Sequence, residues 1–94
     1  MSKEKVLLSV VIPCKNEEKN IERCLRSVLK QAEKFPEAEV MLVDSNSSDD
    51  SVEKAASFDI KIIRSRPSWV STSSAARFLG FLNTHGQYVL VIDA

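Results

Sequence analysis

The chain is poor in glycine and histidine, two residue types on which many ligand-binding and catalytic motifs depend. Its two glycines, Gly80 and Gly86, come late, so the glycine-rich loops of dinucleotide-dependent oxidoreductases and of P-loop NTPases are absent. His85 is the single histidine and has no evident acid–base partner in the sequence, which leaves a hydrolytic triad without support. We expect His85 to lie at a helix C-terminus, where the helix dipole favours it.

An excess of charge, a cysteine framework and long apolar runs are also missing. The 13 Lys and Arg residues balance the 13 Asp and Glu residues, so the formal net charge is zero and binding to nucleic acid is not expected. Cys14 and Cys24 match neither a zinc pattern nor a disulfide framework, and we expect reduced, inert thiols in a cytoplasmic protein. No apolar run reaches the roughly 18–20 residues of a membrane span, and the polar start "MSKEK" is unlike a signal peptide.

Short apolar runs rich in β-branched residues alternate along the chain with other segments. These other segments have an amphipathic pattern or contain residues typical of helix N-caps. Such runs are typical of strands buried on both faces, and apolar residues at i, i+3, i+4 and i+7 are typical of a helix. We predict strands at 6–13, 39–44, 59–65 and 86–94, and helices from an Asn16 N-cap to about residue 35, at 50–57 and at 74–85. This order predicts an α/β fold, Rossmann-like and three-layered (α/β/α), with a mostly parallel sheet of about four strands.

Polar or acidic residues follow three of the predicted strands at their carboxyl ends. The segment Pro13–Glu17 follows the first strand, Asp44 and Ser45 end the second, and Asp93 ends the fourth. Ligands of open α/β sheets bind beyond the carboxyl ends of the strands, so these residues should converge on one edge of the sheet. Their oxygen atoms suit a polar ligand, or a divalent cation together with phosphate.

Four segments carry a resemblance to a known family: "SVVIPCKNEEKNIERCLRSVLKQ", "EVMLVDSNSSDDS", "SAARFLG" and "GQYVLVIDA". In this order they resemble the N-terminal half of a family 2 glycosyltransferase with the GT-A fold. Such enzymes typically read S-[VI]-[VI]-I-P-x-[YR]-N-E-E, then [VI]-V-D-D-G-S-x-D-x-[ST], A-R-N-x-G and G-x-Y-[IL]-x-[FL]-[LI]-D-A-D-D. Each motif is weak by itself, but the resemblance covers nearly the whole chain, from about Leu8 to Ala94.

The resemblance implies a binding site for a nucleotide-diphosphate sugar donor. In such enzymes the segment matching Pro13 to Glu17 lines the nucleotide pocket, and Pro13, Cys14, Asn16 and Glu17 are its candidate site residues here. The acid matching Asp44, next to Ser45, accepts hydrogen bonds from the base, and the arginine matching Arg77 lies near the base and phosphates. The acid matching Asp93 opens an Asp-x-Asp motif that holds Mg²⁺ or Mn²⁺ on the diphosphate, where the metal neutralises charge on the leaving group.

Several positions depart from the family pattern, and they leave the nucleotide and the sugar open. Ser45 stands where a second Asp is common, and Asn46 stands where Gly is common. Because Asn accommodates a left-handed backbone, we expect the turn at Asn46 to persist. Phe78 replaces the Asn of A-R-N, and Thr72 stands where a glycine often precedes the helix.

By the family pattern, the second acid of the Asp-x-Asp motif would follow Ala94. We therefore treat residues 1–94 as a single partial domain, the donor-binding half, to which no catalytic residue is assigned. We expect it to transfer no sugar by itself, to expose apolar surface and to self-associate. The acceptor (a saccharide, a lipid-linked group or a protein) and membrane association of the whole enzyme stay open.

Less specific interpretations compete with this one. The chain can be a non-catalytic α/β nucleotide-binding or interaction module, for instance receiver-like, whereas a nucleotidyltransferase would need a glycine-rich loop that is absent. Asn16 and Glu17 can simply cap the first helix, Asp44 can be a turn residue, and Arg77 can be a solvated helix residue. We expect Ser47 and Ser48 to be helix caps rather than ligand contacts, and Trp69 to cover the core rather than stack on a sugar.

Overall fold

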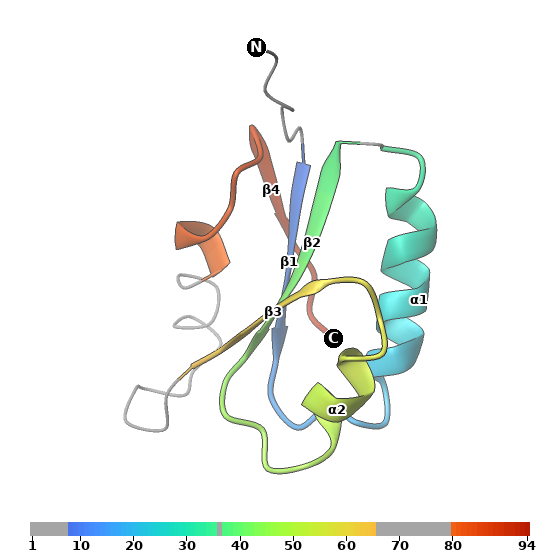
Figure 1. Cartoon of the computed structure of the whole chain (residues 1–94), viewed down its shortest axis with the longest axis vertical. Coiled ribbons are helices and arrows are strands. Elements are labelled where there is room, and N and C mark those ends of the chain that lie inside the picture. The colour runs from blue at the N-terminus through green and yellow to red at the C-terminus, as the bar shows by residue number, and fades with distance from the viewer. Residues whose placement is uncertain (1–7, 36, 66–79) are drawn as a thin grey trace.

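The computed structural model describes residues 8–35, 37–65 and 80–94. In this part of the chain, four strands and two helices alternate as the sequence predicts (Figure 1). The strands are β1 (Leu8–Cys14), β2 (Ala38–Asp44), β3 (Lys61–Arg64) and β4 (Tyr88–Val91), and the helices are α1 (Ile21–Ala32) and α2 (Ser51–Ala55). Neither helix is long and apolar enough to cross a membrane.

The strands form one sheet in the order β3-β2-β1-β4, and all three described pairings are parallel. Cys14 is paired with Asp44 at the carboxyl ends of β1 and β2, and Val11 is paired with Val91 near the end of β4. β2 and β3 lie on one side of β1 and β4 lies on the other, so the strand order reverses next to β1. The predicted α/β fold with a parallel sheet of about four strands is confirmed, and its switch point lies between β1 and β4.

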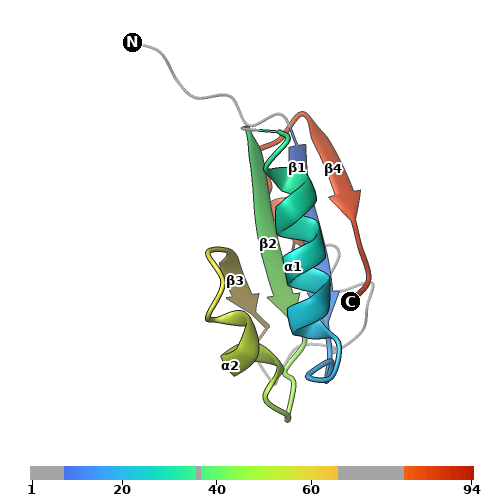
Figure 2. The same ribbon diagram turned by 90° about the vertical axis from the view of Figure 1, so that its right-hand side faces the viewer.

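Helices cover both faces of the sheet. Helix α1 lies over β1 and β2 and α2 lies on the same face (Figure 2), whereas the helical residues 80–82 lie on the opposite face (Figure 1). On the α1 face, Ile12 and Leu42 are fully buried with Leu25 of the helix. On the other face Val11 and Val43 are buried, and a Cβ added to Gly80 would overlap Val11 and lie 3.1 Å from Val43 Cγ2.

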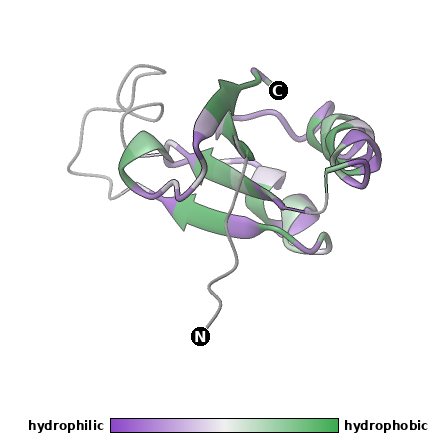
Figure 3. Cartoon of the chain, turned by 90° about the horizontal axis from the view of Figure 1, so that it is seen from above, coloured by the Kyte–Doolittle hydropathy of each residue, from purple (hydrophilic) through white to green (hydrophobic). Residues whose placement is uncertain are grey.

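This two-sided burial explains why β1 and β2 read as continuous apolar runs rather than alternating ones. Successive side chains of a strand point to opposite faces, and here each face has a helix to bury them. In Figure 3 the strands are predominantly hydrophobic along their length, and α1 mixes polar and apolar residues as a helix with one exposed side must.

The first helix begins later than predicted, and the prediction of Asn16 as its N-cap is wrong. Helix α1 starts at Ile21, and its N-cap position is Asn20. Asn16 has a φ of 53°, the left-handed conformation, and its side chain bonds another loop instead. Helix α2 is also shorter than predicted.

His85 is not a helix C-terminal residue as expected, because it lies beyond the helical residues 80–82. Its backbone N–H donates to Glu39 Oε2 at 2.7 Å. The remainder of the helix predicted at 74–85 lies outside the described residues.

Strand β4 forms one edge of the sheet, and its side chains are open to solvent. Tyr88 is 64% exposed and Leu90 is 47% exposed, although both belong to an apolar run. Beside this strand, an apolar groove of about 360 Å³ lies between α1, β1 and β4, with Val28, Phe35 and Leu90 among its lining residues. The prediction of exposed apolar surface is confirmed, and self-association of the chain stays a prediction.

Candidate functional site

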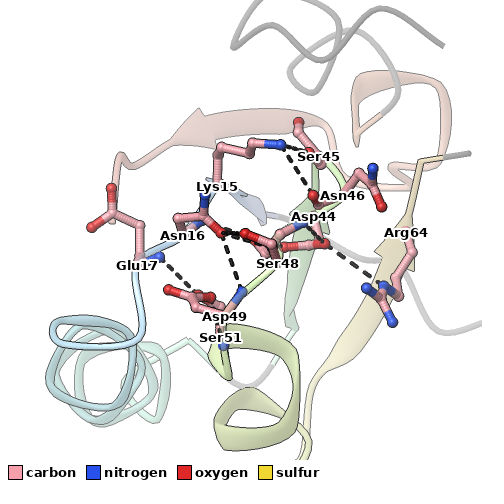
Figure 4. A network of polar contacts seen from close by, with 11 residues as sticks. Lys15, Asn16, Glu17, Asp44, Ser45, Asn46, Ser48, Asp49, Ser51 and Arg64 are labelled. Atoms are coloured by element: carbon pink, nitrogen blue, oxygen red, sulfur yellow. Dashed lines mark hydrogen bonds and ion pairs between the residues drawn. The ribbon is translucent and has the colours of Figure 1, made fainter. Parts of the chain in front are cut away.

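The loops that follow β1 and β2 lie together at the carboxyl edge of the sheet, and a network of hydrogen bonds joins them (Figure 4). The connection starts at the strand ends, where the Ser45 N–H donates to the Cys14 carbonyl at 2.8 Å. Because β1 and β2 are parallel and in register, both loops leave the sheet at the same level. The network therefore occupies the edge at which the sequence predicts a ligand site.

Asp44 is the most deeply buried member of this network. Its side chain is fully buried, and its Oδ2 accepts the Ser47 N–H at 2.9 Å while its Oδ1 accepts the Ser47 hydroxyl. The Arg64 Nε lies 3.6 Å from Oδ2, on a side chain that is 53% exposed. Both carboxylate oxygens thus have partners within the protein, so the observed contacts of Asp44 are those of a residue that holds a turn.

Asn16 connects the two loops from the β1 side. Its N–H donates to Ser47 Oγ at 2.8 Å, and its Oδ1 accepts the Ser48 N–H at 2.8 Å and the Asp49 N–H at 3.3 Å. Asn46 in the other loop has a φ of 61°, so the left-handed turn expected there is confirmed. Two left-handed asparagines therefore shape the two loops, and asparagine tolerates this backbone better than most residues.

Ser47 and Ser48 do not cap a helix, contrary to the prediction. Ser47 bonds Asp44 and Asn16, and Ser48 donates its N–H to Asn16. The N-cap position of α2 is Asp50, whose side chain makes no capping bond. Both serines bond the loop after β1 instead. Because these partners are more than 30 positions away in the chain, no local sequence pattern indicates the bonds.

The start of α2 forms a second set of bonds with the β1 loop. The Glu17 N–H donates to Ser51 Oγ at 2.7 Å, and the Glu18 N–H donates to Asp49 Oδ2 at 3.2 Å. Desolvation opposes the ionised form of Asp49, but hydrogen bonds from Ser51 and from the Glu18 amide outweigh it and lower the pKa of this carboxyl. Asp49 therefore accepts these bonds as a carboxylate at neutral pH.

The other predicted residues of the β1 and β2 ends are buried. Pro13, Cys14 and Ser45 are all buried, and Cys14 packs in the core on the α1 face. Burial, reinforced by the nearby carboxylate of Asp44, raises the pKa of the Cys14 thiol to about 11. Cys14 and Cys24 are free thiols, and burial also raises the pKa of Cys24, as expected for inert cysteines.

Asp93 is exposed and follows β4, where the Ile92 N–H donates to the Val11 carbonyl at 2.9 Å. Among residues 8–35, 37–65 and 80–94, no group of three or more His, Cys, Asp or Glu side chains is placed to hold a metal ion. Any metal at Asp93 would thus need further ligands, such as phosphate oxygens. Arg77 and Trp69 lie outside the described residues.

Lys15 and Arg64 are members of the network to which the sequence assigned no individual role, although Lys15 lies within the predicted segment Pro13–Glu17. The Lys15 Nζ donates to the Ser45 carbonyl at 2.9 Å and to the Asn46 carbonyl at 3.0 Å. A lysine next to a strand end and an arginine at the end of an edge strand have no distinctive spacing. Only the alignment of the strands brings them to the same loop (Figure 4).

A separate polar cluster lies at the opposite, amino-terminal end of the sheet. The buried Ser9 hydroxyl donates to Glu39 Oε2, the His85 N–H donates to the same oxygen, and the Gly86 N–H donates to Ser9 Oγ at 2.8 Å. Desolvation opposes ionisation of Glu39, but the bonds from Ser9 and His85 outweigh it and lower its pKa. This cluster ties β1 and β2 to the segment that enters β4, and so it is structural.

The chain was compared with known proteins. The sequence profile of the family described as glycosyl transferase family 2 matches residues 9–94. The glycosyltransferase GlyG of Streptococcus pneumoniae is 30% identical over 91 residues, which cover 94% of this chain and 30% of that protein.

Solved structures are also similar to this chain. S. aureus TarS 1–349 in complex with UDP-GlcNAc matches with a TM-score of 0.82 and 28% identity, over 93% of this chain and 26% of that one. Glucosyl-3-phosphoglycerate synthase from Mycobacterium tuberculosis, in complex with Mn²⁺, UDP and glucosyl-3-phosphoglycerate, matches with a TM-score of 0.66 and 27% identity, over 93% of this chain and 33% of that one. The chain thus spans about a third or less of the length of these relatives.

Proposed function

The chain belongs to glycosyl transferase family 2, and from this premise we propose that the protein carrying it transfers a sugar from a nucleotide-diphosphate sugar to an acceptor. The observation that supports this most directly is the hydrogen-bonded contact between the loops after β1 and β2, which Asn16, Ser47 and Asp44 hold together. Loops that are already held by bonds within the protein lose little conformational freedom when a ligand binds. Such an edge is suited to a nucleotide.

The proposed nucleotide-sugar pocket comprises Pro13, Cys14, Asn16, Glu17, Asp44, Ser45, Arg77 and Asp93. Of these residues, Pro13, Cys14, Asp44 and Ser45 are buried. Asn16 is exposed and Glu17 is partly exposed, so their side chains can meet a ligand directly. Both oxygens of the buried Asp44 carboxylate already have partners, which favours a role in holding the loop over a direct bond to the base.

A divalent cation, Mg²⁺ or Mn²⁺, belongs to the same proposal, with Asp93 as its ligand from the described residues. One carboxylate is a sufficient protein contribution where phosphate oxygens complete the coordination, as is common for Mg²⁺. The Mn²⁺ and UDP bound to the mycobacterial synthase support the proposal of a divalent cation. When bound, the cation would neutralise negative charge on the departing nucleoside diphosphate.

Calorimetry with UDP-sugars and GDP-sugars, with and without Mn²⁺, tests donor binding on the full-length protein. We expect one class of donor to bind and Mn²⁺ to tighten the binding. In the variant Asp93→Asn, the increase in donor affinity caused by Mn²⁺ should be at least about tenfold smaller. The control Asp59→Asn, at an exposed position before β3, should keep the wild-type increase. If no donor of a broad panel binds the wild-type protein, the proposed function is wrong.

The alternative of a non-catalytic nucleotide-binding or interaction module predicts binding without transfer. Incubating the bound donor with saccharide, lipid-linked and protein acceptors distinguishes the two, because a transferase releases free nucleoside diphosphate only as product accumulates. The acceptor is open among these three classes. We also propose a cytoplasmic location, with the donor site open to cytoplasmic nucleotide sugars, and cell fractionation tests it, including any association with membranes.

A further inference from the structure

Lys15 makes two hydrogen bonds that neither the family resemblance nor the donor chemistry assigns. It follows β1 directly, and its side chain extends to the loop after β2, where it meets the carbonyls of Ser45 and Asn46 at 2.9 and 3.0 Å (Figure 4). Lys15 itself is exposed. One flexible cation thus holds two successive peptide groups of a neighbouring loop.

The Ser45 carbonyl depends on this cation more than the Asn46 carbonyl does, because the bond to Ser45 is partly buried whereas the bond to Asn46 is exposed. Ser45 is only 5% exposed, and an acceptor in a buried position is costly when it has no partner. Asn46 adopts a left-handed backbone at φ 61°, a conformation that persists only where its surroundings support it. In the described part of the chain, Lys15 is the hydrogen-bond donor to both carbonyls, and bonds from an ionised donor are stronger than neutral ones.

The other bonds between the loops act further along the chain. Asn16 bonds Ser47, Ser48 and Asp49, and so it holds the outer part of the loop. Lys15 instead bonds the carbonyls of Ser45 and Asn46, the residues next to the strand end. Among the described residues, Lys15 is the side chain that donates to the carbonyls of Ser45 and Asn46.

We propose that Lys15 is a positioning residue of the donor site: its ammonium group clamps the carbonyls of Ser45 and Asn46 and fixes the turn that these residues form. The proposal rests on the proposed function for the identity of the ligand. The clamp itself is a property of the two loops, and it can be tested without any ligand.

Hydrogen exchange of the backbone amides tests the clamp in the free protein. In Lys15→Met, which keeps the length of the side chain but removes its donors, we expect the amides of residues 45–48 to exchange about tenfold faster. Lys15→Arg should restore slow exchange, because a guanidinium also donates to two carbonyls. The control Lys19→Met removes an equal charge from an exposed position nearby and should change nothing in this loop. Equal exchange in wild type and Lys15→Met overturns the proposal.

Binding of nucleosides and nucleotides tests the consequence for the site. The clamp shapes the loop rather than contacting phosphate. Lys15→Met should therefore weaken the binding of a nucleoside and of its diphosphate (uridine and UDP, or guanosine and GDP) by the same factor of about ten. A loss confined to the diphosphates overturns positioning, since it would mean a direct phosphate contact. If wild type binds none of these probes, the proposed function fails while hydrogen exchange still decides the clamp.

Discussion

The substitution Asp44→Asn removes a buried negative charge at the site and keeps the shape of the side chain. In the native protein its two oxygens accept the N–H and the hydroxyl of Ser47. Asparagine has one acceptor oxygen and an NH₂ group, so it can keep the bond from the Ser47 N–H only if its NH₂ group faces the hydroxyl. The hydroxyl must then turn, and the Arg64 guanidinium loses its charged partner.

The size of the effect follows from these contacts. Losing a hydrogen bond to a charged group costs about 1.5–3 kcal/mol of net stability. The Arg64 contact adds less than about 1 kcal/mol, because at 3.6 Å and with a half-exposed side chain it behaves as a surface ion pair. We therefore expect a loss of about 2–3 kcal/mol, out of about 5–14 kcal/mol for a domain of this length.

Urea unfolding followed by circular dichroism measures this loss. With a slope of about 1–2 kcal/mol per molar urea, the midpoint of Asp44→Asn should fall by about 1–3 M. The control Asp50→Asn changes an exposed carboxylate in the same loop that makes no capping bond, and it should unfold at the wild-type urea concentration. A double-mutant cycle with Ser47→Ala should give a coupling energy above about 1 kcal/mol. Unchanged unfolding of Asp44→Asn would refute the reasoning that this carboxylate holds the turn.

Four further predictions concern the sheet and its edges. Gly86→Ala should cost about 1–3 kcal/mol in urea unfolding, because a Cβ would lie 2.6 Å from Ser9 Oγ; an unchanged midpoint contradicts this close approach. The pKa of Glu39 is lower in the folded state, so its stabilisation is present above the unfolded pKa and is lost as the pH falls through the folded pKa. Glu39→Gln should accordingly show a shallower fall of stability with acid than wild type, and parallel curves would exclude this role. Cys14, with its pKa raised to about 11, should resist iodoacetamide at about pH 8 until urea unfolds the protein, and rapid labelling of the native state argues against its burial. Leu90→Lys should reduce self-association through the β4 edge in sedimentation experiments, and a wild-type chain that stays monomeric at all concentrations excludes this association.

The sequence alone was sufficient for the order of the described strands and helices and for a parallel sheet, but not for the bounds of the helices. Runs such as 39–44 are apolar throughout because both faces of a parallel strand are buried, and this pattern does not depend on what the strand packs against. Alternation of such runs with helices leads to right-handed crossovers, and these place all carboxyl ends at one edge. The positions of Asp44 at the end of β2 and of Asp93 shortly after β4 could therefore be predicted from local pattern, and the motif order pointed to the family that the comparison confirms.

The roles of individual side chains at that edge were decided by tertiary structure. Asn16 looked like a helix cap because capping is a local rule, yet its backbone is left-handed and its side chain bonds amides 32 and 33 residues away. Lys15 and Ser47 had no distinctive sequence signal, since their partners come from the other loop. Hydrogen bonds between loops depend on the register of the two strands that carry them, and a pattern read along one segment does not contain that register. The sequence by itself therefore determined where a site would form, and only the packing of β1 beside β2 determined which atoms hold it together.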